Sequence, residues 1–166
     1  MIQGIIGKSS TTEKIIAPLI PVQTVIEKLP QNFNLLFICE KINDAIQRQV
    51  VLDDTNRVIE PFEFLDLKIN KYLESCCQSG SYAYIETDYF GSVGTQAAGL
   101  FESGKLIEVY KGGDSDIDTT MPWPERLLEQ PINKVLRKIG VLRNPELDEF
   151  DTLGLGEYRH MPYNEI

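Results

Sequence analysis

The stretch from Ser81 to Tyr110 constrains the fold of this chain more than any other. It opens with SYAYIETDYF, which is rich in β-branched and aromatic residues, and continues through the loop GSVGTQ into AAGLF. The turn ESGK then leads into KLIEVY, and Gly104 suits the left-handed position of a short turn. The pattern therefore predicts a β-meander or a pair of hairpins.

Two amphipathic helices flank this meander. Apolar residues recur at helical spacing from Leu65 to Cys76, so we expect a helix from about Pro61 to Gln78. The same spacing predicts a second helix from Pro124 to Ile139, kinked or restarted at Pro131. The expected fold class is α+β, an antiparallel β-meander with two amphipathic helices packed on one face.

The other segments are less regular. Pro18, Pro21 and Pro30 forbid a long continuous helix near the N-terminus. The apolar run Phe33–Cys39 fits either a buried strand or the first turns of a helix, and periodicity does not decide between them. The tail NPELDEFDTLGLGEYRH predicts a short helix and a glycine-rich turn. Because no repeat or low-complexity linker is visible, residues 1–166 are expected to form a single domain.

Composition favours a cytoplasmic location. The sequence contains no run of about 18 apolar residues, and its N-terminus lacks the basic and apolar regions of a secretory signal, so we expect no membrane association. The spacing of Cys39, Cys76 and Cys77 suits neither a disulfide framework nor a tetrahedral metal site. Reduced, mostly buried thiols are therefore expected.

The net charge of −9 is concentrated in the second half of the chain. Residues 1–80 hold 8 basic and 10 acidic side chains (net −2), whereas residues 81–166 hold 8 and 15 (net −7). An acidic half repels phosphate backbones, so nucleic-acid binding is not expected. A basic protein partner is the natural electrostatic match, and solubility alone is the competing explanation.

The first strand of the meander carries the main candidate site. Alternation places Tyr82, Tyr84, Glu86 and Asp88 on one face and Ala83, Ile85, Thr87 and Tyr89 on the other. Two carboxylates beside tyrosines suit a general acid and base, or a divalent-metal pair, at the floor of a cleft. The competing explanation is packing, with Ala83 and Ile85 in the core and the Glu86 face partly solvated or hydrogen-bonded to the second helix.

The loop that follows this strand is a second candidate. This loop segment contains Gly91, Gly94 and Gln96. Its two glycines permit positive φ angles, which a concave backbone needs in order to present N–H groups to an anion or another ligand. A bulged connection that bends the sheet explains the same glycine pair without a ligand.

The acidic stretch after the meander matches the ligand spacing of a calcium loop, at positions 1, 3, 5, 7 and 12. The oxygen-bearing residues at these positions are Asp114, Asp116, Asp118, Thr120 and Glu125. Thr119 stands where such a loop wants glycine, and a strand precedes it in place of a helix. Two interpretations remain, a Ca²⁺ or Mg²⁺ site and a solvated acidic loop that caps the next helix.

Two other motifs are incomplete. In GIIGKSS, Gly4 precedes Gly7 by three positions, whereas a P-loop needs glycine, four residues and then Gly-Lys-Ser/Thr, so we expect a turn after a short N-terminal strand. The chain has one histidine, His160, and no Gly-x-Ser-x-Gly elbow, so a histidine-based nucleophile has little support.

Two stretches carry a resemblance that covers about a quarter of the chain. They are YIETDYFG at Tyr84–Gly91 with Gly94 and Gln96, and DEFD at Asp148–Asp151 with Gly154, Gly156 and Arg159. Together they resemble a group of small bacterial proteins of unknown function, some of which are similar to immunity proteins that neutralise toxins by binding. Ser92 departs from that pattern, which has a second glycine there. The resemblance implies that hairpin and tail are neighbours, with Arg159 paired to Glu86 or Asp88.

Two hypotheses of function follow. The favoured one is a non-enzymatic protein-binding or inhibitor protein of immunity-like type. Its candidate ligand- or partner-binding residues are Tyr84, Glu86, Asp88, Gly91, Gly94, Gln96 and Arg159. The alternative is a small enzyme or divalent-metal-binding protein that uses Glu86 and Asp88, or the Asp114–Glu125 loop. The sequence implies no cofactor other than Ca²⁺ or Mg²⁺.

Overall fold

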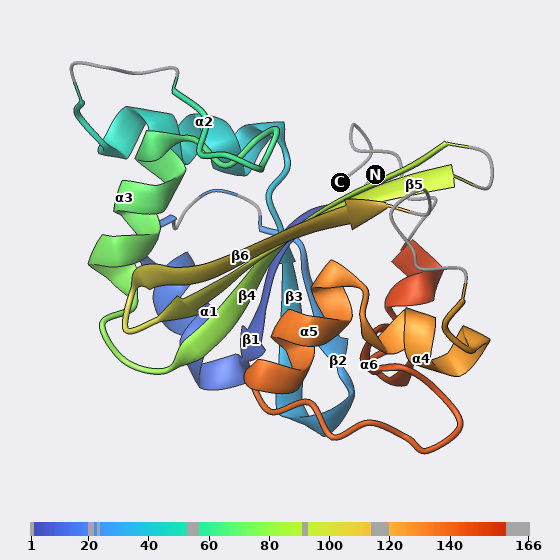
Figure 1. Cartoon of the computed structure of the whole chain (residues 1–166). Coiled ribbons are helices and arrows are strands. Elements are labelled where there is room, and N and C mark those ends of the chain that lie inside the picture. The colour runs from blue at the N-terminus through green and yellow to red at the C-terminus, as the bar shows by residue number, and fades with distance from the viewer. Residues whose placement is uncertain are drawn as a thin grey trace.

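A six-stranded antiparallel sheet forms the centre of the molecule (Figure 1). The computed structural model describes residues 2–19, 22, 24–52, 57–90, 93–113 and 120–158. The strand order is β2-β3-β1-β4-β5-β6. The strands are β1 Ile2–Lys8, β2 Ile26–Leu29, β3 Phe33–Phe37, β4 Ser81–Phe90, β5 Val93–Glu102 and β6 Lys105–Gly113. The α+β class and the predicted meander, β4-β5-β6, are confirmed.

Helices cover both faces of this sheet. The helices are α1 Ser9–Ile16, α2 Glu40–Gln49, α3 Leu67–Cys76, α4 Trp123–Leu128, α5 Pro131–Lys138 and α6 Glu149–Thr152. Short 3₁₀ turns are η1 Ala17–Leu19, η2 Pro30–Asn32 and η4 Leu155–Tyr158. In Figure 1, α3 and α2 lie to the left of the sheet, while α5 and α6 lie to the right.

Strand alternation divides the interior into two clusters, one on each face. Tyr82 and Tyr84 of β4 join the cluster that contains α1, α2 and α3, which we call the α3 face. Ala83 and Ile85 join the cluster that contains α5 and α6, which we call the α5 face. The expectation that both amphipathic helices share one face is therefore wrong, because a sheet that is apolar on both sides needs cover on both sides.

The helix boundaries differ from the predicted ones at prolines. α3 begins at Leu67, since Asp66 caps the helix by accepting from the Ile69 N–H at 2.8 Å. The second predicted helix is two helices, α4 and α5, and the restart predicted at Pro131 is confirmed.

The N-terminal segment runs from strand to helix without the predicted turn. Gly4 and Gly7 lie inside β1, and α1 begins directly after Lys8. The Lys8 ammonium donates to the Gln31 carbonyl at 2.9 Å and lies 3.7 Å from the centre of the Phe33 ring. The ambiguous apolar run is strand β3, with α2 starting only at Glu40.

The cysteines agree with the expectation of reduced, mostly buried thiols. All three cysteines are free; Cys39 and Cys77 are buried and Cys76 is half-buried. In the part of the chain that the structure describes, no helix has the length and apolar character needed to cross a bilayer.

Candidate functional site

The Glu86 carboxylate on β4 is buried beneath the loop that precedes α3. The residue is 6% exposed and projects from the α3 face of the sheet. Its Oε2 accepts a hydrogen bond from the Glu63 N–H at 2.7 Å. Its Oε1 accepts from the backbone N–H groups of Phe64 at 3.0 Å and Leu65 at 2.9 Å. Three successive backbone donors thus converge on one carboxylate.

Tyr84 supplies the fourth donor. Its hydroxyl donates to Glu86 Oε1 at 2.8 Å and accepts from the Gln3 side-chain amide of the neighbouring strand β1, also at 2.8 Å. Burial, and then the nearby Glu86 carboxylate, raise the pKa of the Tyr84 hydroxyl well above its usual range, so it remains a donor. An ionised carboxylate accepts about four hydrogen bonds, and Glu86 accepts four.

Packing of Phe62 places the loop over Glu86. The Phe62 ring meets the Tyr84 ring edge-on, with 5.4 Å between the ring centres. Gly99 of β5 leaves room for this ring, because a Cβ at that position would lie 3.1 Å from Phe62 Cζ and 2.8 Å from Leu106 Cδ1. A side chain at position 99 would therefore require the Leu106 and Phe62 side chains to shift.

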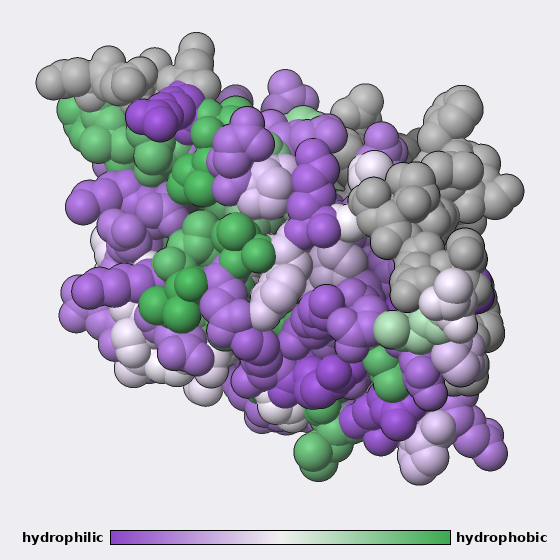
Figure 2. Space-filling model, in the orientation of Figure 1, coloured by the Kyte–Doolittle hydropathy of each residue, from purple (hydrophilic) through white to green (hydrophobic). Residues whose placement is uncertain are grey.

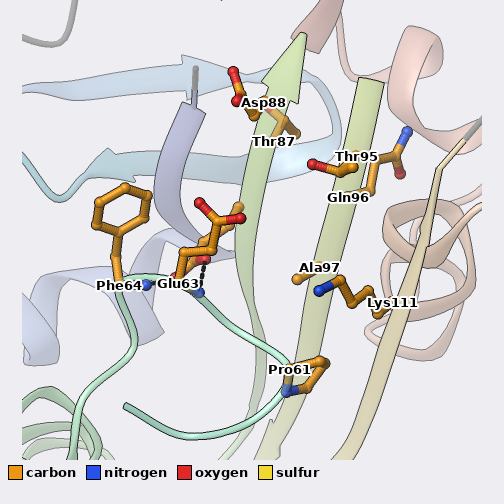
Figure 3. Close-up of a pocket in the computed structure, with 10 residues that line it drawn as sticks. Pro61, Glu63, Phe64, Thr87, Asp88, Thr95, Gln96, Ala97 and Lys111 are labelled. Carbon is orange, nitrogen blue, oxygen red and sulfur yellow. Dashed lines mark hydrogen bonds between the residues drawn. The ribbon is translucent and has the colours of Figure 1, made fainter. Parts of the chain in front are cut away.

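A small hollow lies beside Glu86. Its volume is about 20 Å³, room for about one water molecule. Asp88 of β4, Thr95 of β5 and Lys111 of β6 contribute to its rim together with Pro61 and Phe64 of the loop (Figure 3). The structure therefore provides a polar rim around a carboxylate whose Oε1 accepts three hydrogen bonds and whose Oε2 accepts one.

The structure brings some of the predicted residues together and separates others. Tyr84 and Glu86 are hydrogen-bonded, and Asp88 lies on the same face at an exposed position. Gly94 pairs with Tyr89 across the hairpin. Gln96 lies on the α5 face, where its Oε1 accepts from the Ile132 N–H at 3.4 Å, and Figure 3 shows it directed away from Thr95.

Several predicted residues lie outside the described part of the chain: Gly91, Asp114, Asp116, Asp118 and Arg159. Glu125, the last residue of the predicted metal loop, is exposed in the first turn of α4. Among the described residues, no group of three or more histidine, cysteine, aspartate or glutamate side chains is placed to hold a metal ion. The metal site thus stays a prediction.

The C-terminal tail packs on the sheet face opposite Glu86, where α6 contacts α5 and the Tyr158 ring meets the Phe37 ring edge-on. Phe150, Leu153 and Leu155 are buried in the α5-face cluster with Ile85. The tail and the hairpin thus contribute to one hydrophobic cluster, and the pairing of Arg159 that the resemblance implies concerns a residue outside the described range and stays a prediction.

Sequence reasoning missed several groups around Glu86. Gln3 gave a weak signal, since it is one polar residue in the apolar run IQGII and is 3% exposed. The N–H groups of residues 63–65 gave none, because every residue except proline carries one. Lys111 reaches the rim through strand pairing, opposite Ala97 of β5.

Comparisons of the chain with protein-family models, with curated proteins and with solved structures gave no match.

Proposed function

We propose that this chain is a non-enzymatic protein-binding protein whose partner docks along the outer edge of β6. Within the described residues, β6 is the last strand of the sheet and pairs with β5 alone. Ile107 is 51% exposed and Val109 is 42% exposed on this strand. An outer strand with uncovered apolar side chains is a template for an added strand, and this observation carries the proposal.

A groove beside the strand suits an extended segment. It lies between α3 and the β5–β6 turn, has a volume of about 790 Å³, and is floored by Ile59 and Leu106. Figure 2 shows hydrophobic atoms gathered along the left half of β6, with hydrophilic atoms around them. Main-chain hydrogen bonds to β6 would provide affinity, and the apolar side chains would provide specificity.

The charges on β6 favour a different protein over a second copy of this chain. If the β6 strands of two copies of the chain paired in antiparallel fashion with Ile107 opposite Val109, Glu108 would lie at the centre of the pair. That register also places Lys105 opposite Lys111, and both lysines are exposed. Like charges directly opposite each other destabilise a strand pair, so lysines on an edge oppose self-association.

The Glu86 hydrogen bonds support this surface from beneath. They hold residues 63–65, and the adjacent Phe62 packs against Gly99 beside Leu106, which floors the groove. In this proposal Glu86 is a structural residue. A binding role also agrees with the immunity-like proteins that the sequence resembles.

Capture of binding proteins by immobilised variants tests the proposal. The wild-type chain, Val109→Lys and the control Leu142→Lys, which changes an exposed leucine on another part of the surface, are compared on a lysate of the source organism. We expect a protein that wild type and Leu142→Lys retain and that Val109→Lys loses at least tenfold. The purified pair should then show slower amide exchange in β6.

Equal retention of every captured protein by Val109→Lys and wild type would contradict the β6 edge as the docking site. Capture of no protein by either chain would contradict the binding function itself. Far-UV circular dichroism of Val109→Lys should match wild type, since the side chain is already half exposed.

A further inference from the structure

We propose that the partner strand inserts a tyrosine side chain into the groove between α3 and the start of β6, where its hydroxyl donates to Asn70 Oδ1. The tyrosine belongs to the strand that docks on β6, so this site rests on the function proposed above. The groove has a volume of about 790 Å³, and Figure 1 shows the start of β6 beside α3. Its walls come from α3 and from the β5–β6 turn.

The side chain of Asn70 is the observation that points to a donor. Its Oδ1 is buried and accepts no hydrogen bond from the described part of the chain. Its Nδ2 donates to Glu74 Oε1 at 3.1 Å. Exchanging the two amide atoms would bring two oxygens together, so the atom without a partner is the acceptor. Because buried polar atoms in native proteins are nearly always hydrogen-bonded, this acceptor favours a bound group that donates to it.

A group that enters the groove has access to this amide. Asn70 lines the groove and is half-buried as a whole residue. A small rotation of its side chain would therefore turn Oδ1 towards a donor in the groove.

The charges around the groove balance one another, which favours an uncharged donor. Lys71 pairs with Glu74 at 3.7 Å on α3. Lys105 lies opposite Glu102 across the β5–β6 turn. Glu74 is the only acid in the lining, so a lysine or arginine of the partner would lose hydration there without gaining a free carboxylate.

The apolar floor of the groove selects an aromatic ring. Ile59 and Leu106 form this floor, and both are half-buried. Tyrosine combines an apolar ring with a hydroxyl donor at its tip, and it is enriched among the residues that dominate binding energy in protein interfaces.

A strand added to β6 places such a side chain within reach. Neighbouring strands lie about 4.8 Å apart, and alternate residues of the added strand point to the α3 face. Leu106 packs against the α3-face cluster, and Val109 lies opposite Gly99, which faces Phe62 of that cluster. A tyrosine opposite Leu106 would therefore extend its ring across this leucine to α3.

Selection of displayed random peptides on the immobilised full chain tests the site. We expect the enriched peptides to carry a tyrosine within an alternating apolar pattern. Their affinity for Val109→Lys should be at least tenfold lower than for wild type, since they add a strand to β6.

A double-substitution cycle then tests the hydrogen bond. One enriched peptide, and the same peptide with phenylalanine in place of tyrosine, are titrated by calorimetry against wild type and Asn70→Leu. Loss of the hydroxyl should weaken binding to wild type at least fivefold and leave binding to Asn70→Leu unchanged, because the acceptor is absent there. Asn70→Asp keeps an acceptor oxygen and should keep the hydroxyl effect.

Gln78→Leu is the matched control, since Gln78 lines the same groove but is exposed, and it should show the full hydroxyl effect. Peptides that depend on Val109 but lack tyrosine would overturn the tyrosine site and leave docking at β6 intact. The same holds if tyrosine and phenylalanine peptides bind wild type equally, or if Asn70→Leu keeps the hydroxyl effect. If no enriched peptide depends on Val109, docking at β6 fails and the tyrosine site fails with it.

Discussion

At the residue scale, Glu86 has an energetic role that a single substitution measures. Glu86→Gln keeps the size of the side chain but places an NH₂ group where one carboxylate oxygen accepts from backbone N–H donors. We expect the free energy of unfolding to fall by about 2–3 kcal/mol, because donors then face a donor in a buried site. Urea denaturation measures this loss.

Asp88→Asn is the matched control for this substitution. Asp88 lies two residues further along the same strand face but is exposed, so its change should cost less than about 0.5 kcal/mol. A Glu86→Gln protein as stable as wild type would contradict the structural role. Glu86 would then again be a candidate catalytic carboxylate, because residues kept for function often contribute nothing to the free energy of unfolding or lower it.

At the element scale, local patterns predicted the parts of the fold that depend on them. The period-two alternation of β4 identified its two faces, and Pro131 identified the start of α5. The loop before α3 was not predictable, because it is held by Glu86, more than 20 residues later in the chain.

The N-cap of α6 makes stability depend on pH. Asp148 accepts from the Asp151 N–H at 2.7 Å, yet burial raises the pKa of its carboxyl above the ordinary value. Between the unfolded and folded pKa values the folded state binds more protons, so stability falls as pH rises through that window. Asp148→Asn should raise Tm at pH 7 by roughly 2 °C, and scans at falling pH should show the difference vanish. An equal gain from the exposed control Asp44→Asn would contradict this explanation.

At the scale of the whole molecule, the net charge of the chain is negative, whereas the lysines exposed along β6 are positively charged. The chain carries −9 overall, and this charge attracts a basic protein over a distance comparable to the Debye length. The edge of β6 exposes Lys105 and Lys111. In the proposed complex, the net charge would therefore affect the association rate, whereas these local charges would affect which segment binds after contact.

The two hydrophobic clusters share one sheet, and the molecule should therefore unfold in a single transition. Glu86→Gln weakens the α3 face, while Val135→Ala removes apolar volume from the α5 face at a cost of about 2 kcal/mol. Because the two residues lie on opposite faces with no shared partner, their effects should add in the double variant within about 0.5 kcal/mol. Urea unfolding followed by tryptophan fluorescence and by far-UV circular dichroism should give coincident curves for all four proteins. Two separated transitions, with Val135→Ala shifting only one, would show instead that the faces fold independently.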